Sequence, residues 1–403
     1  MQDKTREPVI IKGCRTPIGK FLGGLSSLSA SDLGSLVVKD LLEKTGVDPR
    51  EVDEVIMGNV IGTGVGQAPA RQASIKGGIP ESVPALTINK VCGSGLKAVM
   101  LAAQAIRAGD ASVVLAGGME SMSNAPFYLR GMRAGVKFGN QKIEDALVSD
   151  GLWCAFGHCH MGAHAEYTAR KGDISRQEAD EFSLRSHKLA TLAMSQGKFE
   201  DEIIPVVCQK DRQEIVVGAD EGPRKDTSIS TLEKLRPAFP DAASESLGGL
   251  TVTAGNAAGL NDGAAGLLVT SREFAEVHGL DIEAKITEYV ASGLDPRDLF
   301  FAPVKAVTEM MYKEKKKISD YGLVELNEAF AVQALADIRG LKLDLDVVNV
   351  YGGAIALGHP IGASGSRILV TLLSAMKDKD VGTGLATLCL GGGNAVALSL
   401  EKI

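Results

Sequence analysis

The stretch VCGSGLKAVMLAAQAIRAGDASVVLAGG, residues 91–118, decides the fold of this chain. Its first part predicts a helix that opens at Ser94-Gly95, because apolar residues recur there at helical spacing. Its last part, VVLAGG, is a short β-branched strand that runs into two glycines. Similar alternation of strands and helices elsewhere in the chain predicts α/β architecture with largely parallel strands.

The same order of elements occurs a second time near the C-terminus. There Ser364-Gly365 opens a helix, and ATLCLGGG, residues 386–393, is the strand that ends in glycines. In both halves an earlier strand ends in asparagine, VIMGN at Asn59 and VELN at Asn327. The repeat predicts two similar α/β halves packed about a pseudo-twofold axis, with the functional site where their loops meet.

The middle of the chain differs from both halves. From about residue 121 to 250 it is polar and irregular, with one clear helix in RQEADEFSLRSHKLATLAMSQGK. A stretch of this length without core strands is usually functional, and we interpret it as an inserted loop domain. The predicted boundaries are 1–121 for the first half (completed by about 251–275), 122–250 for the insert and 276–403 for the second half.

Composition excludes several classes of function. The chain has 403 residues, 45% hydrophobic and 23% charged, as in ordinary globular proteins. Its net charge of −7 provides no general attraction to nucleic acid or to an anionic membrane. Its apolar runs are too short for a membrane span, and its N-terminus resembles no targeting peptide. Six scattered cysteines favour reduced thiols, so we expect a cytoplasmic protein.

Cys92 is a candidate nucleophile. It precedes Gly-Ser-Gly and a helix start, where unpaired N–H groups and the helix dipole stabilise a thiolate and lower its pKa. The alternative is a small buried thiol that fills space, which is the commoner case for an isolated cysteine.

His359 is the candidate base. It lies in GGAIALGHPIGASGSR, residues 352–367, next to Pro360, and histidine is the usual proton acceptor for a thiol near neutral pH. In the repeat it occupies the region that corresponds to Cys92, so twofold packing would bring the two together. The alternative is a histidine that bonds to the backbone of a tight loop.

Two strand ends add polar groups. Cys389, in TLCLGGGNAVA, could be a second acid or base beside an oxyanion hole, or a core residue. Asn327, in ELNEAFA, could hold a water or form an Asx turn. A third cluster, GHCHMGAHAE, has His160 and His164 one helical turn apart, but it lacks the acidic partner of HExxH and any CxxC pair, so we expect no metal.

Together these stretches resemble the thiolase family. NKVCGSG is similar to its acyl-cysteine motif, NVYGGAIALGHPIGASG to its histidine motif, CLGGGNAVA to its second-cysteine motif and ELNEAFA to its Asn-Glu-Ala-Phe motif. HMG (160–162), LRPAF (235–239) and TVTAGNAAGLNDGAA (251–265) also match in order.

The resemblance implies a fold and a set of roles. The fold is two βαβαβαββ halves in a five-layer αβαβα arrangement, with the insert as the coenzyme A-binding loop domain, in a homotetramer or at least a dimer. Cys92 takes the acetyl group, His359 accepts its proton, and Cys389 moves the α-proton of the second acetyl-CoA. Asn327 holds a water that forms one oxyanion hole with His359, and the N–H groups of Cys92 and Gly391 form the other.

The resemblance also implies a substrate channel. Positions that match its acyl and pantetheine lining are His160, Met161, Phe239, Ala329 and Phe330. Arg224 matches a residue near the nucleotide end of coenzyme A. Ala258 stands where many members carry a serine that contacts coenzyme A.

The implied activity is acetyl-CoA C-acetyltransferase, a reversible Claisen condensation of two acetyl-CoA to acetoacetyl-CoA and CoA without metal or cofactor. The Gly-Ser-Gly after Cys92 resembles the acetoacetyl-CoA type. Cys159 replaces a common aromatic residue and Asn394-Ala395 a more usual pair, so a 3-ketoacyl-CoA thiolase of broader chain length is an alternative. A non-catalytic acyl-CoA-binding or lipid-binding protein is a more remote one.

Overall fold

A computed structural model describes residues 4–210, 212–240 and 249–403 of the chain. Its centre is a ten-stranded sheet in the order β14-β15-β16-β13-β1-β12-β5-β3-β4, with β2 paired to β12. The first-half strands are β1 (Pro8–Arg15), β2 (Gly19–Lys20), β3 (Glu54–Gly58), β4 (Ala85–Ile88), β5 (Val113–Ser121) and β12 (Asn261–Ser271). The second-half strands are β13 (Ala284–Gly293), β14 (Leu323–Leu326), β15 (Thr383–Leu390) and β16 (Asn394–Glu401).

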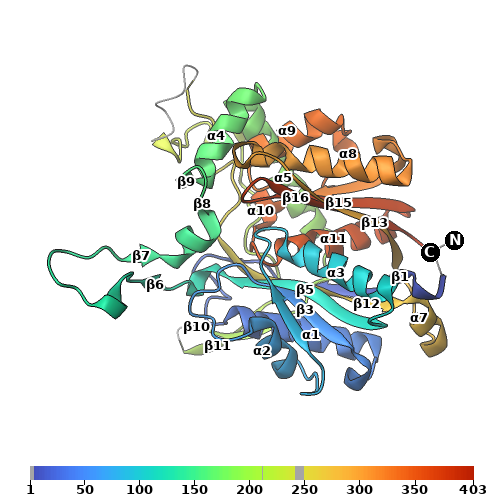
Figure 1. The fold of residues 1–403 in the computed structure, drawn as a ribbon. Helices are drawn as coiled ribbons and strands as arrows, with labels where there is room; N and C mark the ends of the chain where they lie inside the picture. Colours follow the sequence, from blue (N-terminus) through green and yellow to red (C-terminus); the bar gives the residue numbers. More distant parts are fainter. Residues whose placement is uncertain (1–3, 211, 241–248) are drawn as a thin grey trace.

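The two sets of strands and the helices that pack on them form five layers (Figure 1). On the outer face of the first-half strands lie α1 (Ala30–Thr45) and α2 (Pro69–Lys76). Between the two sets of strands lie α3 (Ser94–Ala108) and α11 (Ser364–Asp378), which contact each other. On the outer face of the second-half strands lie α8 (Ala302–Glu314) and α9 (Ala331–Leu341). The predicted five-layer αβαβα arrangement is confirmed.

The two central helices meet at their N-terminal ends. A Cβ atom added to Gly95 would lie 2.7 Å from the backbone nitrogen of Ser366, and one added to Gly365 would lie 2.4 Å from that of Leu96. Only glycine permits this approach of backbone to backbone. The contact is reciprocal, as the predicted pseudo-twofold relation requires, and it places the loops before both helices side by side.

The prediction of largely parallel strands is wrong. Parallel pairing is confined to β3 with β4 and β5, and to β14 with β15, in the described part of the sheet. These strands are joined through helices, which is what a parallel connection needs. In contrast, β16 follows β15 through a short glycine turn, and β12 returns after the insert; both pair antiparallel to their neighbours.

The insert contains more helix than its sequence pattern predicts. The expected helix is α5 (Arg176–Ser195), opened by a capping box between Ser175 and Glu178. A second helix, α4 (Met161–Lys171), was not predicted, because its glycine and its histidine have poor helix propensity. Packing of α4 against α9 stabilises the helix, which its intrinsic helix propensity alone would not do.

The remaining elements are short. They are β6 (Phe127–Tyr128), β7 (Glu144–Asp145), β8 (Trp153–Cys154), β9 (Cys159–His160), β10 (Val206–Lys210), β11 (Gln213–Val217), α6 (Ile229–Leu232), α7 (Arg272–His278) and α10 (Ala354–Leu357). The segment from β6 to β7 extends away from the body as an arm (Figure 1). The predicted domain boundaries stay predictions, and parts of those ranges, 1–3, 211 and 241–248, lie outside the described residues. Among the described helices, none is long and apolar enough to cross a membrane.

Candidate active site

Cys92 lies on a strained turn directly before α3. Val91 has φ +48°, a conformation that β-branched residues rarely adopt. The turn is held by side chains, since the N–H of Val91 donates to Asn89 Oδ1 (2.9 Å) and the Ser94 hydroxyl donates to the Val91 carbonyl (2.7 Å). Strain that the surroundings enforce in this way is typical of functional sites.

The expectation that the helix start lowers the pKa of Cys92 is wrong. Burial raises the pKa of its thiol to about 12, although hydrogen bonds from the backbone N–H groups of Cys92 and Gly391 act in the opposite direction. Desolvation therefore outweighs the helix terminus, and the thiol is neutral at rest. The two N–H groups are the pair predicted to form an oxyanion hole, and both act on the sulfur atom.

His359 is held as a neutral proton acceptor. Its Nδ1 lies 2.6 Å from Ser364 Oγ, and the Ser364 hydroxyl donates to the Pro360 carbonyl (2.9 Å). When the single proton of that hydroxyl is directed to Pro360, Nδ1 is the donor to Ser364, which leaves Nε2 with a lone pair. Nε2 has no partner within the described residues, and burial lowers the pKa of His359 to about 3.

The loop that carries His359 is tied to the first half. The N–H of His359 donates to Asn261 Oδ1 (2.8 Å). Ile361, two residues farther on, belongs to the same apolar cluster as Cys92. The structure therefore brings the two loops together, as the repeat predicts, and Asn261 and Ser364 are positioning residues whose roles the sequence analysis did not identify.

Cys389 is buried at the end of β15, with 2% of its surface exposed. Burial raises its pKa well above the usual range, and the charges of Cys92 and Asp337 add to this effect. Because Cys92 acts on the pKa of Cys389, we treat the two thiols as parts of one site.

Asn327 has an unsatisfied side chain. It is fully buried, and neither Oδ1 nor Nδ2 has a hydrogen-bond partner among the residues described. An Asx turn, the alternative for this residue, would engage Oδ1 and is therefore excluded. A buried amide without partners is costly and indicates a bound water or ligand.

A buried carboxyl group that the sequence analysis missed links the two halves. Glu120, at the end of β5, accepts hydrogen bonds from Asn59 Nδ2 (2.8 Å), the Gly362 N–H (2.9 Å) and the Val60 N–H (3.1 Å). Burial raises its pKa to about 7. The available signal was an acidic residue near the end of a strand of otherwise apolar or small buried residues.

The residues predicted to line a channel lie together. His160 caps α4 by accepting the N–H of Gly162 (3.1 Å), and its ring stacks on Phe239 at 4.8 Å. A Cβ atom on Gly162 would lie 2.0 Å from the Phe239 ring, so only glycine fits in the HMG motif. The same cluster includes Met161, Ala329 and Phe330, and the N–H of Ala258 donates to the Ala329 carbonyl (3.0 Å).

Arg224 lies beside α5 instead. Its N–H donates to His187 Nδ1 (3.2 Å). Burial lowers the pKa of His187 to about 4, and the charge of Arg224 contributes. Arg224 is therefore a cation next to a neutral histidine.

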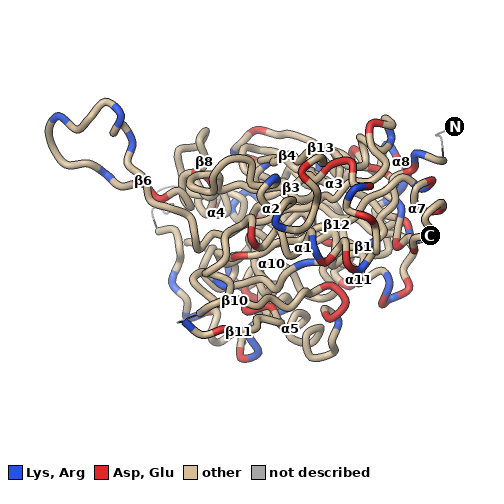
Figure 2. The backbone as a smooth tube through the Cα atoms, turned by 90° about the horizontal axis from the view of Figure 1, so that it is seen from below, with Lys and Arg blue, Asp and Glu red and all other residues tan. Residues whose placement is uncertain are grey.

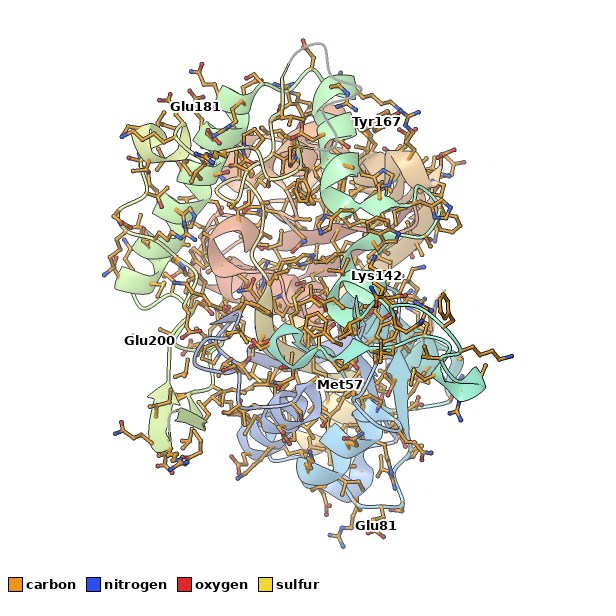
Figure 3. The ribbon with its side chains drawn as sticks, turned by 90° about the vertical axis from the view of Figure 1, so that its left-hand side faces the viewer. Met57, Glu81, Lys142, Tyr167, Glu181 and Glu200 are labelled. Atoms are coloured by element: carbon orange, nitrogen blue, oxygen red, sulfur yellow. The ribbon has the colours of Figure 1, made fainter. Side chains whose placement is uncertain are left out.

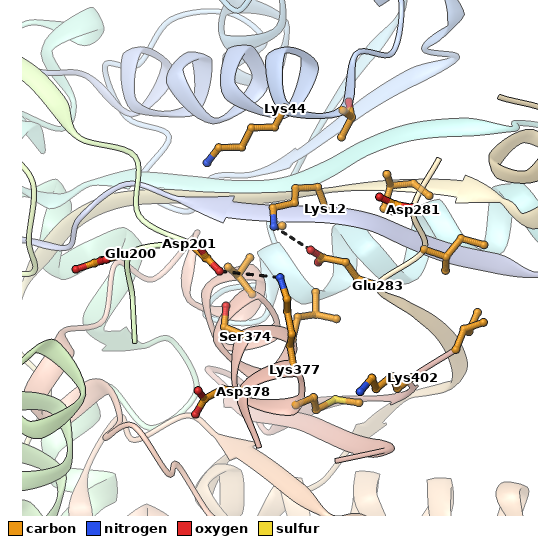
Figure 4. Close-up of a pocket in the computed structure, with 18 of the residues that line it drawn as sticks. Lys12, Lys44, Glu200, Asp201, Asp281, Glu283, Ser374, Lys377, Asp378 and Lys402 are labelled. Carbon is orange, nitrogen blue, oxygen red and sulfur yellow. Dashed lines mark hydrogen bonds and ion pairs between the residues drawn. The ribbon is translucent and has the colours of Figure 1, made fainter. Parts of the chain in front are cut away.

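A separate cavity of about 1180 Å³ lies at the other end of α11 (Figure 4). Its lysines and carboxylates are equal in number and form pairs such as Lys12 with Glu283 (2.9 Å). None of the predicted site residues in the described chain lines it. Likewise, no group of three or more His, Cys, Asp or Glu in that part of the chain is placed to hold a metal ion.

Comparisons with known proteins identify the family of this chain. Residues 8–273 match the family model of the thiolase N-terminal domain, and residues 280–402 match that of the thiolase C-terminal domain. A probable acetyl-CoA acetyltransferase of Escherichia coli (strain K12) is 50% identical over 397 residues, which covers 98% of this chain and 99% of the relative.

Two further relatives extend the comparison. An acetyl-CoA acetyltransferase of Chromobacterium violaceum is 51% identical over 98% of this chain and 100% of the relative. The crystal structure of the Bacillus anthracis acetyl-CoA acetyltransferase superposes with a TM-score of 0.95 at 40% identity, over 98% of this chain and 99% of that one. The chain belongs to the thiolase family.

Proposed function

We propose that this chain is an acetyl-CoA C-acetyltransferase, which condenses two acetyl-CoA to acetoacetyl-CoA and CoA and catalyses thiolysis in reverse. The observation that carries the proposal is the convergence of the Cys92 thiol with the bare imidazole nitrogen of His359, in the loops before the facing starts of α3 and α11. The backbone N–H groups of Cys92 and of Gly391, which follows β15, act on the same sulfur atom. The names of the relatives support the same substrate.

The first half-reaction forms an acetyl-cysteine. Sγ of Cys92 attacks the thioester carbonyl while His359 Nε2 takes its proton. CoA leaves with the proton of Cys389, which becomes a thiolate. Because the pKa of Cys92 is raised to about 12 and that of His359 is lowered to about 3, a thiolate–imidazolium pair does not form beforehand. The proton therefore moves together with the attack, and the N–H groups of Cys92 and Gly391 stabilise the oxyanion as its charge develops.

The second half-reaction makes the carbon–carbon bond. The thiolate of Cys389 removes the α-proton of the second acetyl-CoA, and the resulting carbanion attacks the acetyl group on Cys92. The bond to Sγ breaks, and Cys92 takes back the proton that His359 holds. A high pKa suits this role, because an α-proton is weakly acidic and needs a strong base. We assign the enolate oxygen to His359 and to a water held by the unsatisfied amide of Asn327.

This chemistry needs no metal or redox cofactor, because the side chains supply nucleophile, acid, base and anion stabilisation. We assign the channel residues His160, Met161, Phe239, Ala329 and Phe330, with Ala258, to the acyl and pantetheine portions of the substrate. Arg224 is assigned to the nucleotide end, where a cation offsets the acidic net charge of the chain.

We also propose a homotetramer in the cytoplasm. The arm exposes apolar side chains, with Phe138 98% and Phe127 68% exposed, and surfaces of this kind usually bind protein. It also carries several lysines and arginines (Figure 2), and Lys142 on the arm lies on the same side of the molecule as Tyr167 on α4 (Figure 3). All six cysteines are thiols, which suits a reducing compartment.

The test is the rate of thiolysis for a series of 3-ketoacyl-CoA substrates from acetoacetyl-CoA upward, with Cys92→Ala as the blank. The proposal predicts turnover of acetoacetyl-CoA and a steep fall for longer chains. Comparable rates on long chains would replace the proposed specificity with that of a broad 3-ketoacyl-CoA thiolase. Binding without turnover would indicate an acyl-CoA-binding protein.

A further inference from the structure

Two cysteines outside the candidate active site face each other on the β8–β9 hairpin. Cys154 and Cys159 are directly opposite in the antiparallel ladder. Opposite residues in such a ladder project from the same face with Cα atoms roughly 4.5–5.5 Å apart, a separation that disulfides span. In contrast, the residue opposite Cys208 on β10 is Ile215, so this ladder position offers no second thiol for a disulfide.

Gly157, in the turn of this hairpin, contacts both sulfur atoms. Its N–H donates to Cys154 Sγ (3.2 Å), a bond that stabilises negative charge on that sulfur. A Cβ atom at the same residue would lie 3.2 Å from Cys159 Sγ. The absence of a side chain at position 157 leaves room for the second thiol.

A proton acceptor lies in the same place. A Cβ atom on Gly157 would lie 3.1 Å from His164 Nε2, which is buried and has no partner in the described structure. Burial lowers the pKa of His164, so the ring is neutral near pH 7. A hydrogen bond to the backbone of Arg297 favours the protonated ring and therefore engages a carbonyl at Nδ1, which leaves the lone pair on Nε2.

The hairpin also contacts the candidate active site. A Cβ atom on Gly392 would lie 3.5 Å from the ring of Phe156, in the hairpin turn, and Gly392 directly follows the oxyanion-hole residue Gly391. At the other end, His160 of the channel follows Cys159 in the chain. A change in the geometry of the hairpin therefore displaces both the oxyanion-hole residue Gly391 and the channel residue His160.

We propose that Cys154 and Cys159 are a redox-active pair that forms a reversible cross-strand disulfide. The oxidant is a low-molecular-weight disulfide. One cysteine thiolate attacks it, displaces one thiol and forms a mixed disulfide; the second thiolate then attacks the protein sulfur and displaces the other thiol. Two protein thiols are oxidised, one external disulfide is reduced to two thiols, and the protein protons pass to the released thiols. The consequence for turnover rests on the proposed function.

The first test needs no catalytic activity. The purified protein is equilibrated in glutathione buffers from fully reduced to fully oxidised, alkylated, and digested with trypsin. Peptide 143–170 contains Cys154 and Cys159 as its only cysteines. We expect this peptide to lose both alkyl groups together and to become lighter by two hydrogen atoms, at a midpoint where Cys208 stays alkylated. Independent alkylation of the two cysteines, or glutathione attached to one of them without the internal bond, would overturn the proposal.

The second test compares Cys154→Ser with Cys208→Ser. Both replacements keep a hydrogen-bonding group, and neither position belongs to the candidate active site. We expect oxidation to lower kcat/KM for acetoacetyl-CoA about tenfold in the wild type and in Cys208→Ser, because small displacements of catalytic donors have effects of this size. A reducing thiol restores the activity, and Cys154→Ser resists the loss.

A negative result in one test can be distinguished from a negative result in the other. If Cys154→Ser loses activity at the same midpoint as the wild type, the loss comes from another thiol, such as Cys92, and the link between hairpin and turnover is wrong. If the reduced protein has no thiolysis activity, the proposed function fails while the peptide map still decides on the disulfide.

Discussion

The two helix starts at the centre of the molecule share a backbone and differ in what they hold. Ser94 at the start of α3 and Ser364 at the start of α11 both donate to a carbonyl a few residues earlier. Ser94 then accepts the N–H of Lys90, whereas Ser364 faces His359 Nδ1. In the first half the serine fixes a turn, and in the second half it fixes the tautomer of a base.

The strands before these helices repeat the contrast. Asn59, at the end of β3, donates to Glu120 through Nδ2, although its Oδ1 has no partner among the described residues. Both polar atoms of Asn327, at the end of β14, are unpaired there. The comparison teaches that the first half supplies the nucleophile on a turn fixed by hydrogen bonds, and the second half supplies the polar groups left open for the reaction.

The largest effect is expected at the nucleophile. Cys92→Ala should lower turnover by about a thousandfold or more, because no other group can form the acyl intermediate. The fold should persist, since one sulfur is lost from a half-buried position; circular dichroism and thermal unfolding check this. Retained turnover in a correctly folded variant would refute the role of Cys92.

The two strand-end asparagines should respond in opposite ways. Asn327→Ala should lower kcat about a hundredfold, by removing a group that stabilises developing charge, with little loss of stability because no hydrogen bond is broken. Asn59→Ala should cost about 1–3 kcal/mol of unfolding free energy, because it removes a donor to buried Glu120. Steady-state kinetics and denaturant unfolding of both variants separate the two effects; a stability loss confined to Asn327→Ala would reverse the comparison.

The paired serines give a smaller contrast. Ser364→Ala and Ser94→Ala should each cost about 1 kcal/mol of stability, because both remove buried hydrogen bonds. Only Ser364→Ala should lower kcat, by about tenfold, since His359 then loses the acceptor that fixes its tautomer. Equal kcat values in the two variants would show that Ser364 does not orient the base.

The smallest effect is expected for His359→Ala on the rate at which the resting Cys92 thiol is alkylated. Because the pKa of Cys92 is raised to about 12, the rate of its alkylation by iodoacetamide should rise about tenfold per pH unit from neutral pH to about pH 10. His359 stays uncharged over that range, so His359→Ala should change this rate by less than about twofold. Alkylation is followed on tryptic peptide 91–97, whose only cysteine is Cys92. A plateau near neutral pH that His359→Ala abolishes would indicate a preformed ion pair.

Much of the architecture could be predicted from the sequence. The repeated Ser-Gly helix starts and glycine-terminated strands predicted the two halves and the meeting of Cys92 with the His359 loop, because both are local patterns. Strand direction could not be predicted for β12 and β16, since it depends on how the insert and the glycine turn return the chain. Helix α4 was missed because its stability comes from packing against α9 rather than from its own residues.

The electrostatics of the site were harder to predict. The pKa of Cys92 depends on burial, which a helix-start motif does not reveal, and this is why the expected lowering was wrong. Glu120, Asn261 and Ser364 act through partners far away in sequence or through a side-chain tautomer, and no spacing rule identifies such contacts.

The most direct test of the central claim is to trap the acyl intermediate. The protein is mixed with acetyl-CoA, quenched in acid and digested, and the acetyl group is located by mass spectrometry, with Cys92→Ala as the control. We predict one acetyl group on peptide 91–97, at Cys92, and none in the variant. An acetyl group on peptide 143–170 or on Cys389, or none in a preparation that turns over acetoacetyl-CoA, would contradict the assignment of Cys92 as the nucleophile.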